Sequence, residues 1–162
     1  MSFKLRGQKG FHENDTGLGI HAVLRFFYND AQTATGALED LGFDTEVMEA
    51  LARARAKHAG CVIVGGATGD GKSTTLIRLM DRLYEENNGA LAIVTVEDPV
   101  EYQFKNKRSI VNQREIGSDT QSLQTALKNA LRQAPDVILI GEIRDRETMS
   151  AAIAYAQSGH LC

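Results

Sequence analysis

The sequence of 162 residues is 43% hydrophobic and 24% charged and contains no Trp, which is an ordinary composition for a globular protein. A chain of this length folds without metals or disulfides, so Cys61 and Cys162 are expected to be free thiols in a reducing compartment. The formal net charge of −3 disfavours binding to nucleic acid through a basic face. The apolar runs are far shorter than the roughly 20 residues of a membrane span. A secretory signal is not expected either, because no apolar stretch follows the basic residues at the start.

The first 43 residues carry scattered glycines and one short apolar stretch, Ile20–Tyr28. This pattern predicts a small β-rich remnant. From Thr45 onward the apolar residues recur at regular spacing. We therefore divide the chain into residues 1–43, a partial amino-terminal domain with a linker, and residues 44–162, a second domain.

The second domain begins with a predicted helix, in which Thr45 acts as the N-cap and Gly60 follows the end. Residues Cys61–Val64 are then expected to form a short buried strand, followed by a glycine-rich turn. Leu76, Leu79, Met80 and Leu83 recur at helical spacing. The helix that they predict should end near residues 87–89, which are Asn, Asn and Gly.

The alternation of strands and helices continues along the chain. Leu91–Val96 is a predicted strand, Leu123–Leu131 a predicted helix that Pro135 terminates, and Val137–Ile140 another strand. Strands separated by helices predict a largely parallel sheet that is covered on both faces. The fold class is therefore α/β, and ligands are expected at the carboxyl ends of the strands.

Gly66–Ser73 reads Gly-Ala-Thr-Gly-Asp-Gly-Lys-Ser and fits the pattern G-x-x-x-x-G-K-[ST] between a predicted strand and a predicted helix. Glycines let the backbone wrap around a phosphate group, and the helix N-terminus attracts the anion. Lys72 would reach the terminal phosphates, and Ser73 would ligate Mg²⁺. The alternative is a glycine-rich turn without a ligand. The predicted nucleotide-binding residues are Gly66, Ala67, Thr68, Gly69, Asp70, Gly71, Lys72, Ser73 and Thr74.

Acidic residues follow two of the predicted strands. Glu97 comes after Leu91–Val96, and Glu142 comes after Val137–Ile140. Both should therefore face the phosphate loop, where a carboxylate orients the attacking water or accepts its proton while Mg²⁺ neutralises charge. Acidic residues after strands also serve as turn residues or helix caps, and that reading stays open.

Four ordered motifs stand at residues 66–76, 96–102, 131–145 and 158–161, the last reading Ser-Gly-His-Leu. Together they resemble the motifs of the secretion (traffic) ATPase superfamily, which includes type II secretion ATPases, type IV pilus motors and ATPases of conjugation or type IV secretion. The resemblance covers about residues 38–162. Asn112–Glu115, which reads Asn-Gln-Arg-Glu, is similar to the pilus retraction and type IV secretion branch.

The resemblance implies a RecA-like ATPase domain that works as a homo-oligomer, a hexameric ring, and drives an inner-membrane platform protein of a pilus, conjugation or secretion machine. It implies a cytoplasmic protein, or one peripheral at the inner membrane, without direct contact to nucleic acid. By motif, Lys72, Ser73 and Thr74 belong to the Walker A loop, and the catalytic residues are Glu97, Glu142 and His160. Gly141 stands where many P-loop proteins carry Asp. Mg²⁺ would therefore rest on Ser73, phosphates and waters, and Glu142 would act through a water.

The sequence departs from the family pattern at several places. Asp70 replaces a small residue, and its charge is expected to weaken nucleotide binding unless the carboxylate points to solvent. Ala134 replaces a frequent acidic residue, and Ser158 replaces Thr. Family members also carry a complete amino-terminal domain, whose arginines can contact nucleotide across a ring interface, and Arg25 is the one candidate remnant. The ATPase domain is expected to be incomplete at its carboxyl end.

Two other functions stay open on the sequence. The chain could be a truncated module that binds ATP or a ring partner without turnover. A small P-loop kinase or GTPase is disfavoured, because the guanine-reading pattern Asn-Lys-x-Asp is missing from the sequence and the acidic and histidine motifs would be coincidences. His160 could also be an ordinary polar residue near a helix end, with Gly159 at the position after the cap.

Overall fold

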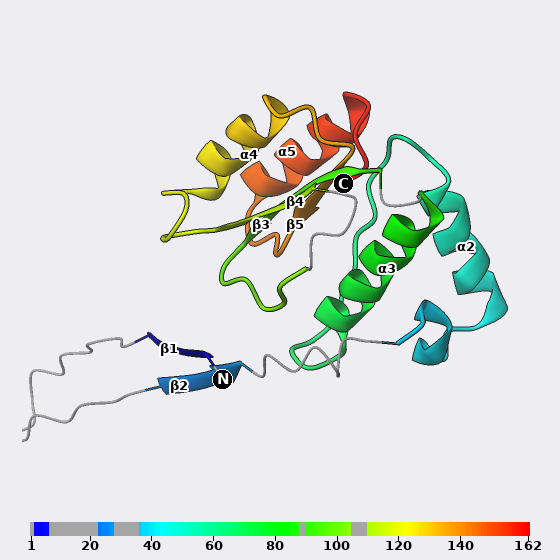
Figure 1. The fold of residues 1–162 in the computed structure, drawn as a ribbon, viewed down its shortest axis with the longest axis horizontal. Helices are drawn as coiled ribbons and strands as arrows, with labels where there is room; N and C mark the ends of the chain where they lie inside the picture. The colour runs from blue at the N-terminus through cyan, green and yellow to red at the C-terminus, as the bar shows by residue number, and fades with distance from the viewer. Residues whose placement is uncertain (1, 7–22, 28–35, 88–89, 105–109) are drawn as a thin grey trace, which may run out of the picture.

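The computed structural model describes residues 2–6, 23–27, 36–87, 90–104 and 110–162. Its elements in chain order are the strands β1 (Ser2–Arg6) and β2 (Val23–Phe27), the 3-10 helix η1 (Leu38–Leu41), the helices α2 (Thr45–Arg55) and α3 (Lys72–Glu86), the strands β3 (Ala92–Glu97) and β4 (Ile110–Glu115), the helix α4 (Leu123–Leu131), the strand β5 (Val137–Ile140) and the helix α5 (Arg146–Gln157). Figure 1 shows this order along the chain. Among these helices, none is both long and apolar enough to cross a membrane.

Strands β1 and β2 form an antiparallel pair, from Ser2 opposite Phe27 to Arg6 opposite Val23. This pair agrees with the β-rich segment that the sequence predicts. Arg25, the candidate remnant of an amino-terminal domain, falls in β2 opposite Lys4, and its side chain lies outside the described part of the structure. The division between residues 43 and 44 stays a prediction.

The second sheet has the strand order β4-β3-β5, and both pairings are parallel. The predicted strand Leu91–Val96 is observed one residue later, as β3, and β5 has the predicted bounds. Strand β4 was not predicted. None of its residues is fully buried, and polar residues follow its first two, so it lacks the apolar pattern of a core strand.

Helices cover both faces of this sheet, as predicted. Residues of β3 alternate between the faces: Ile93 packs with Met80 of α3, whereas Val96 packs with Leu127 of α4. Tyr155 of α5 packs on the same side as α4. In Figure 1, α4 and α5 accordingly lie on one side of the sheet and α3 on the other. The carboxyl ends of the strands and the start of α3 thereby come to the same edge.

Helix α2 begins where the sequence predicts, but its cap is a different residue. Asp44 has extended backbone angles, and its carboxylate accepts a hydrogen bond from the Val47 N–H at 2.9 Å. Thr45 is already the first helical residue, so the prediction that Thr45 caps the helix was wrong by one residue. An Asp at this position accepts a hydrogen bond from an N–H that has no partner within the helix. Its negative charge also interacts favourably with the positive end of the helix dipole.

The predicted strand at Cys61–Val64 is not observed as a strand. Gly60 forms an isolated parallel bridge with Leu161, and the Val62 N–H donates to the Cys162 carbonyl at 2.8 Å. Leu161 bridges Val137 on its other side, so the segment 161–162 lies between β5 and the segment 60–62. The segment 161–162 is too short to pair with the whole of Cys61–Val64 as a strand. Cys61–Val64 therefore stays irregular although its residues have high β propensity.

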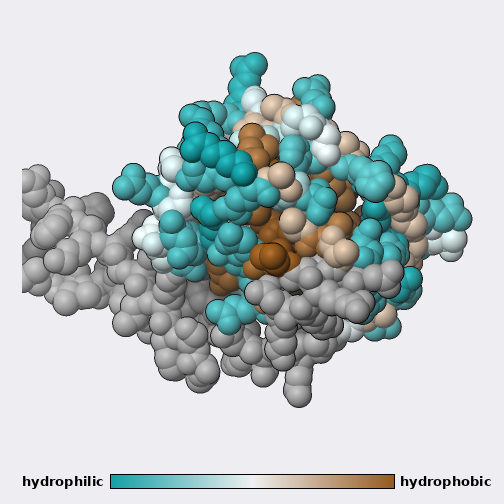
Figure 2. Space-filling model, turned by 45° about the horizontal axis from the view of Figure 1, so that its top comes forward, coloured by the Kyte–Doolittle hydropathy of each residue, from teal (hydrophilic) through white to brown (hydrophobic). Residues whose placement is uncertain are grey.

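Beyond these bridges the same region holds an apolar cavity of roughly 420 Å³, bordered by the segment 61–66, α3 and β5. Ile63 is 60% exposed there. Figure 2 shows apolar surface gathered in the middle of one face, with hydrophilic residues above it and on both sides. Burial of the segment before the phosphate loop is therefore much less complete than the sequence predicts.

Candidate functional site

One cleft of roughly 530 Å³ brings together the phosphate loop and both predicted acids, Glu97 and Glu142. It is bordered by the loop and first turn of α3, by the end of β3 with the segment 98–104, and by the residues that follow β5. These are the carboxyl ends of parallel strands and the N-terminus of a helix. The sequence prediction that these groups share one edge of the sheet is therefore confirmed by the geometry.

Two glycines give the phosphate loop its shape. Gly69 and Gly71 have φ angles of 93° and 82°, a left-handed conformation that residues with a Cβ rarely adopt. Gly71 is the N-cap of α3, and its carbonyl accepts the Thr75 N–H at 2.8 Å. The first N–H groups of α3 have no partner within the helix and lie at the cleft, which suits an anionic group.

Both charged side chains of the loop contact Ala67. The Lys72 ammonium donates to the Ala67 carbonyl at 2.5 Å, and the Asp70 carboxylate accepts from the Ala67 N–H at 2.6 Å. Asp70 therefore folds back onto the loop instead of pointing freely to solvent. Gly66 accommodates this arrangement, because a Cβ at that position would lie 3.1 Å from the Asp70 carboxylate.

Glu97 is the last residue of β3, whereas the sequence predicts that it follows the strand. Its side chain is buried, with 9% of the residue exposed. The Thr95 hydroxyl donates to its Oε1 at 2.6 Å, and the Gln113 amide donates to the same oxygen at 3.2 Å. Burial raises the pKa of Glu97, and these two hydrogen bonds oppose that shift. A carboxyl with a raised pKa is a better proton acceptor near neutral pH.

Glu142 follows β5 and forms an ion pair with Arg144 at 2.7 Å. Both side chains are well exposed, so this pair contributes little stability, roughly 0–1 kcal/mol. Gly141 explains how the two acidic segments come close. A Cβ at Gly141 would lie 3.2 Å from the Cα of Glu97, so a side chain there would push the ends of β3 and β5 apart.

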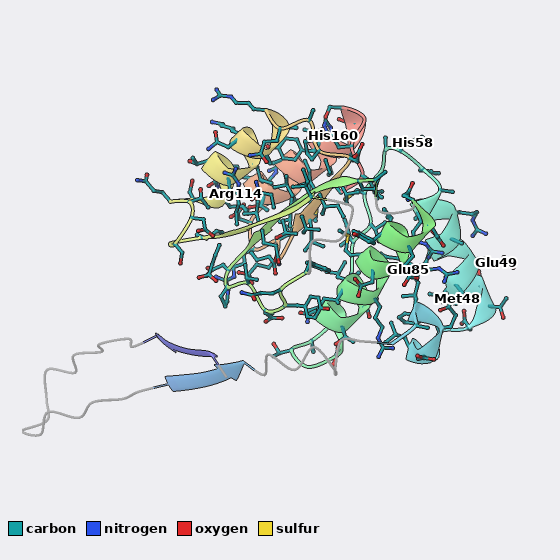
Figure 3. All side chains as sticks on the ribbon, in the orientation of Figure 1. Met48, Glu49, His58, Glu85, Arg114 and His160 are labelled. Atoms are coloured by element: carbon teal, nitrogen blue, oxygen red, sulfur yellow. The ribbon has the colours of Figure 1, made fainter. Side chains whose placement is uncertain are left out.

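His160 does not border the cleft. It follows the end of α5, where Ser158 is the C-cap and Gly159 has a φ of 98°. Its Nδ1 lies 3.0 Å from the Ser158 hydroxyl, and its carbonyl accepts from the Gly60 N–H at 3.1 Å. Figure 3 shows His160 at the end of α5. The structure thus bears out its position near a helix end, and a catalytic role of His160 stays a prediction.

Side chains with oxygen atoms that suit a cation border the cleft. Ser73 and Glu142 both border it, and hydroxyl and carboxylate oxygens suit Mg²⁺. In the described ranges no group of three or more His, Cys, Asp or Glu side chains could hold a metal ion by itself. This donor set fits an ion that is held largely by phosphate oxygens and waters, as the resemblance implies.

Sequence reasoning missed the role of Gln113. Its amide contacts Glu97, yet the segment Asn112–Glu115 served only as a marker of a family branch, because β4 was not predicted. The pairing of Arg144 with Glu142 was missed as well. The motif spacing places these two residues near each other, and it gives no information about which side chains pair.

The model of the family described as "Type II/IV secretion system protein" matches residues 15–162. The protein named Type IV pilus ATPase PilU, from Pseudomonas aeruginosa, is 48% identical over 154 residues, which cover 90% of this chain and 39% of PilU. The protein named Type IV pilus retractation ATPase PilT, from the same organism, is 40% identical over an alignment of 163 positions, which covers 99% of this chain and 44% of PilT. The solved structure described as "Crystal Structure of the Pilus Retraction Motor PilT and Bound ADP" matches with a TM-score of 0.68 and 46% identity, covering 78% of this chain and 35% of that one. The chain therefore spans about two fifths of the length of these curated relatives and shares the α/β fold of the solved motor.

Proposed function

This chain belongs to the Type II/IV secretion system protein family, and we propose that it is the nucleotide-binding part of an ATP-hydrolysing motor subunit. The machine would be a type IV pilus, a conjugation system or a type II or type IV secretion system. The observation that carries this proposal is the single cleft in which the phosphate loop, Glu97 and Glu142 meet. The relatives named PilU and PilT are both called ATPases.

In this proposal the phosphates of ATP lie against the N–H groups of the loop and of the first turn of α3. Lys72 leaves the Ala67 carbonyl, which it contacts in this structure, and pairs with the terminal phosphates. Glu97 and Glu142 orient the attacking water and accept its proton. Ser73 would hold Mg²⁺ together with phosphate oxygens, Glu142 would reach it through water, and the ion would supply neutralisation of the developing charge. His160 is proposed as a further catalytic residue on the resemblance alone.

A second candidate function is nucleotide binding without turnover. One observation favours it. Glu142 is paired with Arg144, which also borders the cleft, instead of facing the cleft alone. In this case ATP would bind to the loop, and residues from outside this chain would be required for hydrolysis.

The assembly and location of the whole protein are also proposed by family membership. We expect a homo-oligomer, a hexamer in the full-length form, that contacts an inner-membrane platform protein from the cytoplasmic side. ATP and Mg²⁺ are the expected substrate and cofactor, and nucleic acid is not an expected partner. The two relatives are named type IV pilus ATPases, and the family is described as Type II/IV secretion system protein, which supports this placement.

The two functions are separated by nucleotide binding and ATP hydrolysis measured on the same variants. Lys72→Ala should abolish nucleotide binding under either function, because the loop loses its cation. Glu142→Gln should leave binding within about twofold of the wild type and lower turnover by at least about a hundredfold if the chain hydrolyses ATP. Glu147→Gln is the matched control, since this exposed residue of α5 lies outside the cleft lining.

Intact binding with no turnover in the wild type would select the binding module. Intact binding in Lys72→Ala would contradict both functions. Turnover that survives in Glu142→Gln would remove Glu142 from the catalytic set.

A further inference from the structure

The side chain of Gln113 makes three hydrogen bonds that link two parts of the cleft. Its Nε2 donates to the Glu97 carboxylate at 3.2 Å and to the Tyr102 carbonyl at 2.7 Å. Its Oε1 accepts from the Phe104 N–H at 2.9 Å. We call the segment 98–104 the cleft loop. The amide group of Gln113 therefore contacts both the buried Glu97 carboxylate and the backbone of the cleft loop, at Tyr102 and at Phe104.

The register of the sheet places Gln113 in this position. Thr95 of β3 lies opposite Gln113 of β4, and directly paired residues of neighbouring strands point to the same face. Glu97 is two residues beyond Thr95 and shares this face. Thr95 and Gln113 consequently approach Glu97 from its own strand and from the neighbouring one, and both donate to its Oε1.

The cleft loop borders the space that a ligand would fill. Tyr102 and Phe104 both line the cleft and pack edge to face, with ring centroids 5.0 Å apart. Near the start of the loop, the Val100 N–H donates to the Glu115 carboxylate at 3.1 Å. The backbone of Glu101 also hydrogen-bonds the Glu97 carboxyl. Two residues of β4, Gln113 and Glu115, thus hold the cleft loop. Of these two, Gln113 also donates to Glu97.

We propose that Gln113 is a positioning residue that couples the cleft loop to Glu97, so that a ligand in contact with the loop sets the orientation of this carboxylate. The inference rests on the proposed function, in which Glu97 orients or activates water. An amide is the group that this position requires, because it donates twice and accepts once. Gln113→Glu keeps the acceptor for Phe104 and loses both donors, whereas Gln113→Met keeps the approximate shape and loses all three bonds.

Turnover provides the first test. Gln113→Met and Gln113→Glu should each lower turnover by about tenfold or more, a part of the roughly 10² to 10⁴ that general acid–base catalysis contributes. The nucleotide dissociation constant should stay within about twofold, because Gln113 does not border the cleft itself. Gln121→Met, at an exposed residue, is the control and should match the wild type. If the wild type hydrolyses ATP, unchanged turnover in both Gln113 variants would overturn the proposal.

A double-mutant cycle separates positioning from a merely structural role. If Gln113 acts through Glu97, the pair Glu97→Gln with Gln113→Met should be no slower than Glu97→Gln alone. Losses that multiply would mean that Gln113 acts independently of Glu97, which contradicts the proposal. Urea unfolding of each variant identifies those that fail to fold.

A second measurement does not depend on hydrolysis. In protein labelled with ¹³C at Glu carboxyl groups, adding ATP should shift the Glu97 signal clearly less in Gln113→Met than in the wild type. Exchange of the Phe104 amide hydrogen should also become faster in Gln113→Met. If the wild type binds ATP without turnover, hydrolysis by this chain is disproved. The two signals still show whether Gln113 couples the cleft loop to Glu97. An equal shift in both proteins would overturn this coupling.

Discussion

Glu97, which is proposed to act on the attacking water, is placed at a cost in stability. Its carboxyl is buried in the sheet, and burial raises its pKa although Thr95 and Gln113 donate to it. The folded protein therefore holds the Glu97 proton to a higher pH than the unfolded chain does. Between the unfolded pKa and the raised folded pKa, unfolding releases this proton, so the contribution of Glu97 to stability is lost as the pH rises through this range.

Replacing Glu97 by Gln should consequently stabilise the fold. The free energy of unfolding at pH 7 is expected to increase by about 1 kcal/mol, because a buried charge is replaced by a neutral group of the same shape. The difference between variant and wild type should shrink as the pH falls toward the unfolded value of 4.5. Urea unfolding at several pH values measures this difference. A variant that is less stable than the wild type at pH 7 would contradict this account of Glu97.

Asp70 is the other residue whose charge matters at the site. Its carboxylate folds onto the loop and accepts the Ala67 N–H, so it braces the loop and also places a negative charge beside the expected phosphates. We expect the charge to dominate, because Coulomb repulsion at a few ångströms outweighs one exposed hydrogen bond.

Asp70→Asn should therefore bind ATP about three- to tenfold more tightly than the wild type, and Asp70→Ser should behave alike. The gain should diminish at high salt, which screens exposed charges. Titration of the nucleotide by calorimetry at two salt concentrations provides the measurement. Weaker binding in both variants would show instead that the brace on Ala67 is the more important contribution.

At the scale of elements, an ion pair connects α2 to α3. The Arg55 guanidinium contacts the Glu86 carboxylate through two nitrogens at 3.0 Å each. The Arg55 side chain is only 7% exposed, and among the described residues its Nη1 has no hydrogen-bond partner. Hydrogen bonding to Arg55 lowers the pKa of Glu86. The helix that begins at the phosphate loop is therefore held at its far end by a mostly buried charge.

Glu86→Ala should lower the free energy of unfolding by about 1–2 kcal/mol, since it leaves this guanidinium buried without its counter-charge. Because the pKa of Glu86 is lowered in the folded state, its contribution is present above pH 4.5 and lost as the pH falls through the folded pKa. Glu49→Ala removes an exposed pair with Arg53 and should cost at most about 0.5 kcal/mol. Equal losses in the two variants, measured by thermal unfolding, would disprove the special role of Glu86.

At the scale of the whole molecule, the site is assembled from segments that lie far apart in the sequence. The phosphate loop, the end of β3 and the residues after β5 meet only because the sheet is parallel and α3 crosses back over it. The cleft lies at one edge of the sheet, where groups from a neighbouring copy would reach it in the proposed homo-oligomer.

Turnover per chain should therefore rise with protein concentration if copies of this chain complete each other's sites. Hydrolysis measured over a hundredfold concentration range, with Glu142→Gln as the blank, tests this expectation. Turnover per chain that is constant over the range would show that each copy works alone. Light scattering on the same samples reports whether the rise coincides with assembly.

The sequence by itself determined the class of fold and most of the site. The glycines and Lys72 identified the phosphate loop, and the apolar spacing gave α3, α4 and β5, because both signals are local. Strand β4 could not be found in this way, since its burial depends on β3 beside it. The segment Cys61–Val64 had the right residues for a strand and lacked a long enough partner.

Only the tertiary structure decided which side chains meet. Motif spacing placed Glu97 and Glu142 at one edge of the sheet, but it could not place Gln113 against Glu97, close Asp70 onto Ala67 or leave His160 outside the cleft lining. These contacts depend on strand register and on side-chain geometry across segments that are distant in the chain. Local sequence patterns fix the elements, whereas hydrogen bonds between elements exist only once the sheet has formed.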